Sequence, residues 1–306
     1  MKVAVFGATG FVGSYLVDAL LEAGHTPSAL VRPGSEGKLH ERERCRTTEG
    51  DLANADAVRE TLEGCDAAIY CVGLLREFPR KGITFEEAHF EGAKRAAEAA
   101  KSTGVKRFLL MSSNGVRPDG TPYQRTKYRA EQHIAQMGFN LTVFRPSVIF
   151  GDPRGLMEIG TQLYRDLVKP PLPAVSFHTG LKPEAGQLFM SPVYVRDVAD
   201  AFVAVLDKPE TAGLTFELGG PEELSWTEMI RRVATAAGRK KIILPMPVGL
   251  MMFGATLFDW LPFFPVTRDQ LRMLVDGNIA SPDELRRLIG REPRAFGSEN
   301  LAYLSS

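Results

Sequence analysis

The segment GTPYQRTKYRAE contains Tyr123 and Lys127, two residues whose side chains and spacing could support proton transfer. On a helix, residues i and i+4 share one face, so the phenol and the ammonium would point into the same cleft. A phenol titrates near ~10, whereas a general acid or base works best near neutral pH. Closing that gap takes about three pKa units, on the order of 4 kcal/mol, to which a neighbouring ammonium could contribute. The pair is therefore a candidate acid–base pair, a grip for a ligand, or an ordinary pair on a helix surface.

A glycine-rich turn near the start of the chain is the second candidate site. The segment FGATGFVG lies between a short apolar run, KVAVFG, and a run with helical periodicity, FVGSYLVDALLEAGH. Its first glycine permits a tight turn, its second lets the backbone approach a pyrophosphate, and its third allows close packing of helix on strand. This context predicts dinucleotide binding, with a purely structural turn as the alternative. The expected cofactor contacts are Gly7, Thr9, Gly10, Phe11, Val12 and Gly13.

The residue that ends the second predicted strand, PSALVR, indicates which dinucleotide binds. NAD sites usually carry an acidic residue here, which binds the ribose 2′-hydroxyl. This chain has Arg32, whose guanidinium suits a 2′-phosphate, and Lys38 could add to the positive charge. The alternative is that Arg32 is a solvated loop residue. We expect the cofactor to be NADP, with NADPH preferred over NADH.

Two further segments follow predicted strands and complete the expected cofactor site. Asp51 would accept a hydrogen bond from the adenine amino group while Leu52 covers the ring, the alternative being that Asp51 simply caps a helix. After the strand DAAIYCVG, the backbone of Cys71, Val72 and Gly73 would pass close to the middle of the cofactor. Both segments fit the rule that parallel α/β sheets bind ligands at the carboxyl ends of their strands.

Strand and helix patterns alternate over the first 150 residues, as a parallel sheet with crossover helices requires. They include a long helix from Phe85 to Thr103, the strand RFLLMSS, and a helix with Thr121 as its cap and Pro122 at its first position. We predict an α/β fold: a Rossmann-type doubly wound parallel sheet with a smaller, mostly helical C-terminal lobe.

The change in rhythm after Gly151 suggests where the domains divide. We expect a dinucleotide-binding domain over residues 1–150, whose sheet is completed by about 188–220. The C-terminal or substrate lobe would then comprise residues 151–187 and 221–306.

Composition argues against several other classes of protein. Lys+Arg and Asp+Glu both number 37, so no bulk positive charge would attract nucleic acid. The three cysteines form no CxxC pair, which is typical of a reduced compartment, and the five histidines show no metal-ligand spacing. The histidine spacing therefore predicts no metal site. A strand-like run follows Met1 at once, in place of the charged and apolar regions of a signal peptide, so we expect a cytoplasmic protein.

Residues 244–265, LPMPVGLMMFGATLFDWLPFFP, form the most apolar stretch of the chain. Asp259 and four prolines interrupt it, so it does not provide the ~20 clean residues of a membrane span. One interpretation is a buried helix of the second lobe. The other is a surface that touches a membrane, a respiratory complex or another hydrophobic partner, which would make the protein peripherally membrane-associated.

Taken together, the motifs resemble the short-chain dehydrogenase/reductase superfamily, through GxxGxxG, GDL, MSS at the end of strand five, and YxxxK. The segments RPSVIFG, VYVRDVADA and FELGGPEELS extend the resemblance to its extended branch. A closer similarity is to the nucleotide-binding accessory subunit of respiratory complex I and its bacterial relatives. It is carried by YCVGLLREFPRKGITFEEAHFEGAKRAAEAAKSTGVKRFLLMSS and PVTRDQLRMLVDGNIASPDEL. This resemblance implies tight binding of NADPH and a stabilising role beside a quinone site, without established turnover.

The resemblance also implies roles for individual residues. Lys127 would hydrogen-bond the hydroxyls of the nicotinamide ribose. Ser113 or Ser112, at the end of strand five, would hold the oxygen of a substrate. The backbone at Pro146 and Ser147 would lie near the nicotinamide, although Pro146 could equally serve only to end strand six.

Departures from the family's pattern leave two functions open. Asn114 occupies the position that most often holds the active serine in extended members, and an amide does not relay a proton as a hydroxyl does. The first hypothesis is an NADP(H)-binding protein with a structural or redox role near a quinone system. The second is an active NADPH-dependent oxidoreductase or epimerase, in which Tyr123 and Lys127 act on a hydrophobic carbonyl substrate such as a quinone.

Overall fold

The chain, described by a computed structural model over residues 1–179, 187–249 and 268–305, divides into two units. The first comprises Met1–Pro146, Val195–Glu217 and Glu284–Arg291, and the second comprises Ser147–Tyr194, Leu218–Asp283 and Glu292–Ser306. The chain therefore returns twice to the first unit, and each unit is described separately below.

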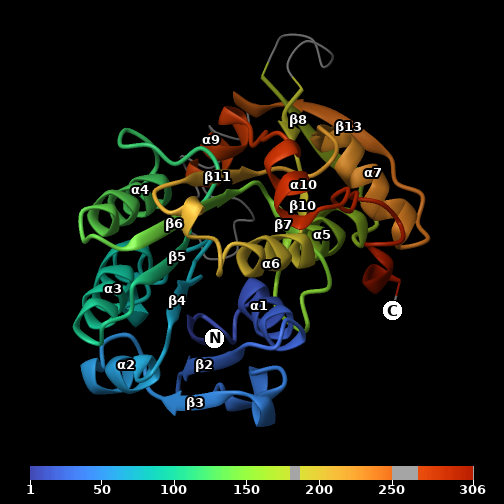
Figure 1. Ribbon diagram of the computed structural model, residues 1–306. Helices are drawn as coiled ribbons and strands as arrows, with labels where there is room; N and C mark the ends of the chain where they lie inside the picture. The colour runs from blue at the N-terminus through green and yellow to red at the C-terminus, as the bar shows by residue number, and fades with distance from the viewer. Residues whose placement is uncertain (180–186, 250–267, 306) are drawn as a thin grey trace. The chain divides into compact units, whose positions relative to one another are not determined.

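Seven strands form the sheet of the first unit, in the order β11-β6-β5-β4-β1-β2-β3 (Figure 1). They are β1 (Lys2–Phe6), β2 (Thr26–Val31), β3 (Arg46–Glu49), β4 (Ala67–Tyr70), β5 (Arg107–Met111), β6 (Asn140–Pro146) and β11 (Thr215–Leu218). β1 pairs in parallel with both β2 and β4, and the pairs β2–β3, β4–β5 and β5–β6 are also parallel. The strand order thus reverses at β1, which creates the switch point where such sheets bind ligands. The predicted doubly wound Rossmann-type sheet is confirmed.

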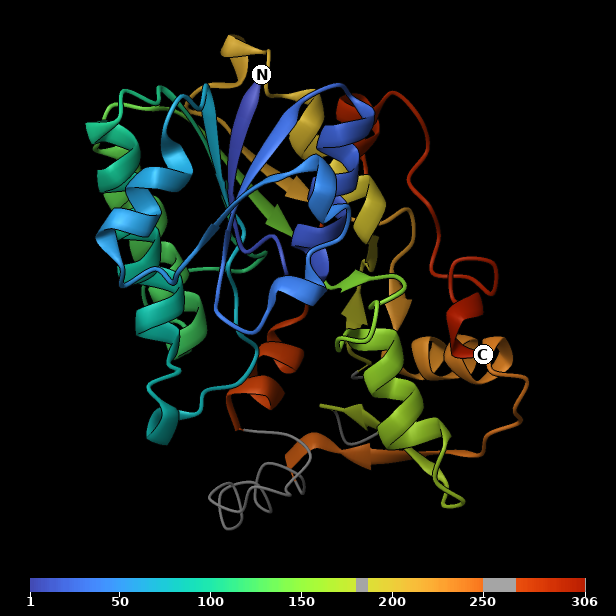
Figure 2. The same cartoon turned by 90° about the horizontal axis from the view of Figure 1, so that it is seen from below.

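Helices cover both faces of this sheet (Figure 2). On one face lie α2 (Ala55–Leu62), α3 (Gly92–Ser102) and α4 (Pro122–Ala135), with α3 in contact with both of its neighbours. On the other face, α1 (Phe11–Glu22) packs against α6 (Val195–Ala204). This arrangement buries the sheet on both sides, as a parallel sheet requires.

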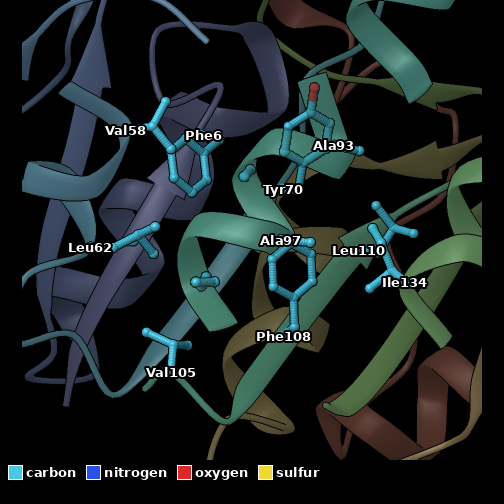
Figure 3. Packing of buried hydrophobic residues seen from close by; sticks show 14 of the residues in the cluster. Phe6, Val58, Leu62, Tyr70, Ala93, Ala97, Val105, Phe108, Leu110 and Ile134 are labelled. Carbon is cyan, nitrogen blue, oxygen red and sulfur yellow. The ribbon is translucent and has the colours of Figure 1, made fainter. Parts of the chain in front are cut away.

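The core between the sheet and α2–α4 joins large side chains from the strands to small ones from α3 (Figure 3). Phe6, Tyr70 and Phe108 are fully buried, and α3 contributes Ala93 and Ala97. The small alanine side chains let α3 approach the sheet closely, while each buried aromatic ring stabilises the fold by roughly 1.5–3 kcal/mol. This packing holds the strand ends that carry the predicted site residues.

The two helices next to the candidate site differ in how well local sequence predicts them. Thr121 caps α4 as predicted, in a reciprocal capping box with Gln124, and Pro122 is the first helical residue. The helix predicted from Phe85 instead opens with a π-helical turn, Glu86–Glu91, before α3 begins. A π-helical turn makes i→i+5 hydrogen bonds, which changes the side chains that face inward.

The second unit combines three short strand pairs with helices. β8 (Ala174–His178) pairs in parallel with β13 (Ile243–Pro247), β7 (Ile149–Phe150) in parallel with β10 (Val193–Tyr194), and β9 (Phe189–Met190) antiparallel with β12 (Leu224–Ser225). The helices include α5 (Ile159–Leu163), α7 (Trp226–Ala236) and α9 (Arg268–Asp276), while α10 (Asp283–Ile289) leads back to the first unit.

The interpretation of residues 244–265 as a buried helix is wrong at their start, because residues 244–247 belong to strand β13. Pro245 and Pro247 have no N–H to donate within a helix, whereas the edge of a two-stranded sheet tolerates them. The part of this stretch from residue 250 onward lies outside the described residues. Within the described ranges, none of the helices has the length and apolar character needed to cross a membrane.

Candidate functional site

The glycine turn adopts a conformation that side chains would block. Gly7 has a φ of +102°, and a Cβ there would lie 3.1 Å from the backbone and Sγ of Cys71. A Cβ on Gly13 would lie only 2.0 Å from the carbonyl oxygen of Gly7, so this glycine sets the close packing of α1 on the turn. Between them, the N–H of Gly10 donates to the same carbonyl oxygen at 2.9 Å. The structural reasons predicted for the first and third glycines are therefore present.

The N-terminus of α1 is suited to an anion. Gly10 is its N-cap and offers no side chain, and the first turn contains no acidic residue. The backbone N–H groups of a first helical turn have no intrahelical partners, and the helix dipole concentrates positive charge there. The turn and the helix start together fit the pyrophosphate of a dinucleotide, the group for which this motif is built.

The predicted nucleoside-binding residues lie at the ends of β2 and β3. Arg32 is exposed directly after β2, and within the described part of the chain its guanidinium forms no ion pair. Asp51 is exposed and accepts from the backbone N–H groups of Ala53 and Asn54, at 2.9 and 3.1 Å. The N-cap of α2 is Asn54, so the alternative assignment of Asp51 as the helix cap is wrong. Leu52 packs partly buried against the core of the first unit.

The segment after β4 brings backbone next to Lys127. Cys71 is buried, its thiol donates to the carbonyl oxygen of Phe6 at 3.2 Å, and burial raises its pKa to about 12. This thiol is therefore inert, and only its backbone is available to a ligand. Val72 is half-buried, and a Cβ added to the exposed Gly73 would lie 3.9 Å from Nζ of Lys127. The structure thus joins the glycine turn, the post-β4 segment and the lysine of the YxxxK motif.

Lys127 is a buried cation held by backbone carbonyls. Its side chain is 6% exposed, and Nζ donates to the carbonyl oxygens of Met111 at 3.1 Å and Ser112 at 3.5 Å. Burial lowers its pKa to about 8, against the opposing influence of Glu131, whose carboxylate is paired with Arg145. Because this ammonium has little contact with water, any hydrogen-bond acceptor placed beside it stabilises its charged form.

Tyr123 lies close to Lys127, but the ammonium does not activate its hydroxyl. Nζ of Lys127 lies 5.6 Å from the centroid of the Tyr123 ring, so it approaches the face of the ring. Burial raises the pKa of the Tyr123 phenol, and a side-chain hydrogen bond with Ser113 acts in the opposite direction. The protein's own groups therefore do not supply the pKa decrease that acid–base catalysis at neutral pH requires.

The structure separates the three polar residues that follow β5. Ser113 is half-buried, its hydroxyl donates to the carbonyl oxygen of Asn114 at 3.4 Å, and it is the one of the three whose side chain lowers the pKa of the Tyr123 phenol. Ser112 is 4% exposed, and its Oγ has no hydrogen-bond partner among the described residues. It lines a cavity of about 10 Å³ together with Lys127, which is close to the space that one water molecule needs. Asn114 donates its backbone N–H to the carbonyl oxygen of Pro146 at 2.9 Å.

The last two predicted residues fall on either side of the boundary between the units. Pro146 ends β6 in the first unit, and Ser147 begins the second. The Ser147 hydroxyl donates to the carbonyl oxygen of Asn278 at 2.8 Å, within the second unit. This hydroxyl is therefore engaged in local structure, and cofactor contact at Ser147 remains a prediction.

Sequence reasoning missed His89 as a residue of this site. It considered the histidines only as metal ligands, and among the described residues no group of three His, Cys, Asp or Glu side chains is placed to hold a metal. His89 is 2% exposed, lies in the π-helical turn, and its ring packs edge-on against Tyr123 with 5.0 Å between centroids. The sequence feature that could have indicated it is a single histidine on the inward face of the helix after strand four.

Comparisons with known proteins agree with this geometry. A family model described as NAD(P)H-binding matches residues 7–166. The chain is 27% identical over 315 residues to the mitochondrial NADH-ubiquinone oxidoreductase 40 kDa subunit of Neurospora crassa, covering 99% of this chain and 78% of that protein. It is 28% identical over 264 residues to the ceramide reductase of Caulobacter vibrioides, covering 84% of this chain and 78% of that one.

A solved structure with a similar fold supports the assignment of the fold. The UDP-glucose 4-epimerase of Bifidobacterium longum, in complex with NAD+ and UDP, matches with a TM-score of 0.75 over 100% of this chain and 97% of that chain, at 17% identity. The family model spans more than half of the sequence, and its first matched residue is Gly7 of the glycine turn. The chain therefore belongs to the NAD(P)H-binding family and has the Rossmann-type fold of the short-chain dehydrogenases/reductases.

Proposed function

We propose that this NAD(P)H-binding chain holds NADP(H) tightly and serves a structural or redox role at a quinone-reducing respiratory complex. The observation that carries the proposal is the cradle formed by the glycine turn, the uncapped start of α1 and the buried ammonium of Lys127. Similarity to the NADH-ubiquinone oxidoreductase subunit over nearly the whole chain supports the respiratory setting. The proposal includes no metal and no nucleic acid.

Contact with a complex or a membrane surface is part of the same proposal. On β13, Leu244 is 50% exposed, and Ile242, which directly precedes the strand, is 70% exposed. When a partner covers apolar side chains this exposed, their surface is removed from water, which favours binding. We therefore assign the start of the 244–265 stretch to a peripheral contact.

Arg32 supports NADP(H) over NAD(H) as the bound form. Its guanidinium follows the strand end at which dinucleotide sites read the 2′ position, and it is free of ion pairs with the described residues. An unpaired arginine can form a bidentate, charge-assisted contact with a phosphate, whereas an aspartate there would favour the 2′-hydroxyl of NAD.

Replacement of Arg32 tests this preference. We expect Arg32→Asp to weaken NADPH binding about tenfold or more and to leave NADH binding equal or stronger, because the carboxylate repels the 2′-phosphate. Both affinities are measured by fluorescence titration, after mass analysis of the nucleotide that co-purifies with the wild-type chain. Arg125→Asp, the same charge change at an exposed position on α4, serves as the control and should leave the ratio unchanged. Wild-type preference for NADH would contradict the assignment.

A second candidate function, an NADPH-dependent reductase acting on a hydrophobic carbonyl compound, is favoured by the influence of the Ser113 side chain on the Tyr123 phenol, whose pKa it lowers. The bound cofactor would supply a hydride. Ser113 would hold the carbonyl oxygen, and Tyr123 would donate a proton to it from Oη. Similarity to a ceramide reductase supports this alternative.

Tyr123→Phe distinguishes the two functions. If the chain is a reductase, we expect turnover with carbonyl substrates to fall ~100-fold or more while NADPH affinity stays nearly the same, since only the transferred proton is lost. The assay follows NADPH oxidation with a panel of quinones and long-chain ketones. Absence of turnover in the wild-type chain, or equal rates in both proteins, excludes reduction by Tyr123 and leaves the structural role.

A further inference from the structure

His89 occupies an unusual position in the backbone. It lies within the π-helical turn Glu86–Glu91, which opens the helix predicted from Phe85 as regular. Turns of this kind are rare and are frequent at functional sites, because they redirect a side chain that an α-helix would place elsewhere. Here the redirected side chain is 2% exposed and lies beside Tyr123.

The hydrogen bonds of His89 fix one tautomer. The backbone N–H of Leu74 donates to Nε2 at 3.0 Å, so this nitrogen carries no proton. The proton therefore lies on Nδ1, which donates to Oγ1 of Thr126 at 3.1 Å. The Thr126 hydroxyl in turn donates to the backbone carbonyls at the start of α4, of Pro122 at 2.9 Å and Tyr123 at 3.1 Å. A continuous series of hydrogen bonds thus runs from the backbone of Leu74 through His89 and Thr126 to the backbone carbonyl of Tyr123.

The rings around His89 restrict the same tyrosine. Phe85 stacks on His89 with centroids 5.3 Å apart and an interplanar angle of 17°. The Tyr123 ring meets both of them edge-on, at 5.6 Å from Phe85 and 5.0 Å from His89. Such edge-to-face contacts stabilise the relative orientation of the rings in addition to the effect of their burial.

His89 is not built to transfer protons. Both ring nitrogens are engaged, and burial together with the nearby charge of Lys127 lowers its pKa to about 2. An imidazole that stays neutral at every physiological pH acts through its shape and its two hydrogen bonds.

We propose that His89 is a positioning residue that links the post-β4 segment Val72–Leu74 to Tyr123, so that ligand contact at that segment and the orientation of the phenol depend on each other. This inference rests on the proposed function, because Val72 and Gly73, which directly precede Leu74, belong to the predicted cofactor-binding segment. The geometry points to coupling since Leu74 and Thr126, which belong to separate elements, share His89 as their common partner.

The tautomer provides a test that needs no cofactor. Long-range ¹H–¹⁵N correlation spectra of the full chain should show His89 protonated on Nδ1 and unchanged from pH 5 to pH 9. Titration of His89 in that range, or a proton on Nε2, would overturn the proposal. Because the measurement uses the ligand-free chain, its result is independent of whether NADPH is the cofactor.

Two variants then test the coupling. His89→Leu keeps the bulk and removes both hydrogen bonds, whereas His89→Gln retains one donor and one acceptor. We expect His89→Leu to bind NADPH about tenfold more weakly. Without the hydrogen bonds that fix its position, the Tyr123 phenol should reach solvent, and its pKa should fall toward that of an ordinary tyrosine, read by ultraviolet difference titration against Tyr123→Phe. His89→Gln should restore most of both properties. Should His89→Leu fail to fold, Thr126→Val removes the same link from its other end.

The outcomes separate this inference from the proposed function. If the wild-type chain does not bind NADPH, the proposed function fails, whereas the phenol titration still judges the link between His89 and Tyr123. If folded His89→Leu shows wild-type NADPH affinity and an unchanged phenol titration, His89 has no positioning role.

Discussion

Gly13→Ala should destabilise the first unit by about 3 kcal/mol or more and abolish dinucleotide binding. The added Cβ would lie 2.0 Å from the carbonyl oxygen and 2.7 Å from the carbonyl carbon of Gly7. Backbone atoms cannot rotate away as a flexible side chain can, so α1 must move off the turn. Overpacking of a rigid core typically costs about 1–3 kcal/mol, and a backbone clash this close lies beyond the upper end. Displacing α1 also removes the aligned N–H groups that would hold the pyrophosphate.

Chemical denaturation and NADPH titration measure the two effects. Gly37→Ala is the matched control, because a Cβ on Gly37 would meet no atom within 4 Å and the φ of this residue is not positive. It should be neutral or slightly stabilising, since alanine reduces the freedom of the unfolded chain. A Gly13→Ala protein with wild-type stability and affinity would show that the turn does not pack as described.

Lys127→Met should make the ligand-free chain more stable while nearly eliminating NADPH binding. Lys127 is 6% exposed, and burial lowers its pKa from an ordinary 10.5 to about 8. That difference means that the charged ammonium destabilises the folded state by about 3 kcal/mol at neutral pH. Methionine removes this cost but leaves the carbonyls of Met111 and Ser112 without their donor. We expect a net gain of about 1–2 kcal/mol.

The pH dependence of this stabilisation follows from the direction of the pKa change. Between pH about 8 and 10.5, the unfolded chain keeps the Lys127 proton and the folded chain has lost it. The unfolded state then binds more protons, so wild-type stability rises with pH across this window, by about 3 kcal/mol from this group alone. Lys127→Met lacks that rise, and its advantage over the wild type should disappear by pH 10.5.

Cofactor affinity should change in the opposite direction. The proposed charge-assisted hydrogen bonds from Lys127 to two ribose hydroxyls, at about 1.5–3 kcal/mol each, would correspond to a loss of at least 100-fold in NADPH affinity. Lys101→Met, at an exposed position near the end of α3, controls for the loss of one positive charge. Urea denaturation at pH 7 and pH 10 and NADPH titration at pH 7 provide the data. A variant that is less stable at pH 7 and binds NADPH normally would refute the buried-cation description.

Local sequence was sufficient to predict the framework of the first unit. The apolar run KVAVFG, the spacing of Gly7, Gly10 and Gly13, and the helix cap at Thr121 each act over a few residues. Their physical causes are backbone sterics, the unpaired N–H groups of a helix start and the alternation of strand and helix, none of which depends on distant parts of the chain. The same short-range logic indicated that Lys127 and Tyr123 share a helix.

Long-range packing decided the properties on which the chemistry depends. The i, i+4 spacing predicted a common face for Tyr123 and Lys127, but only the tertiary structure shows the ammonium over the ring and the phenol pKa raised by burial. The influence of Ser113 rather than Ser112 on the Tyr123 phenol, the strand at 244–247 and the π-helical turn around His89 also depend on neighbours distant in sequence. Desolvation and hydrogen-bond partnership arise when separate strands and helices meet, so residue type and spacing alone could not determine them.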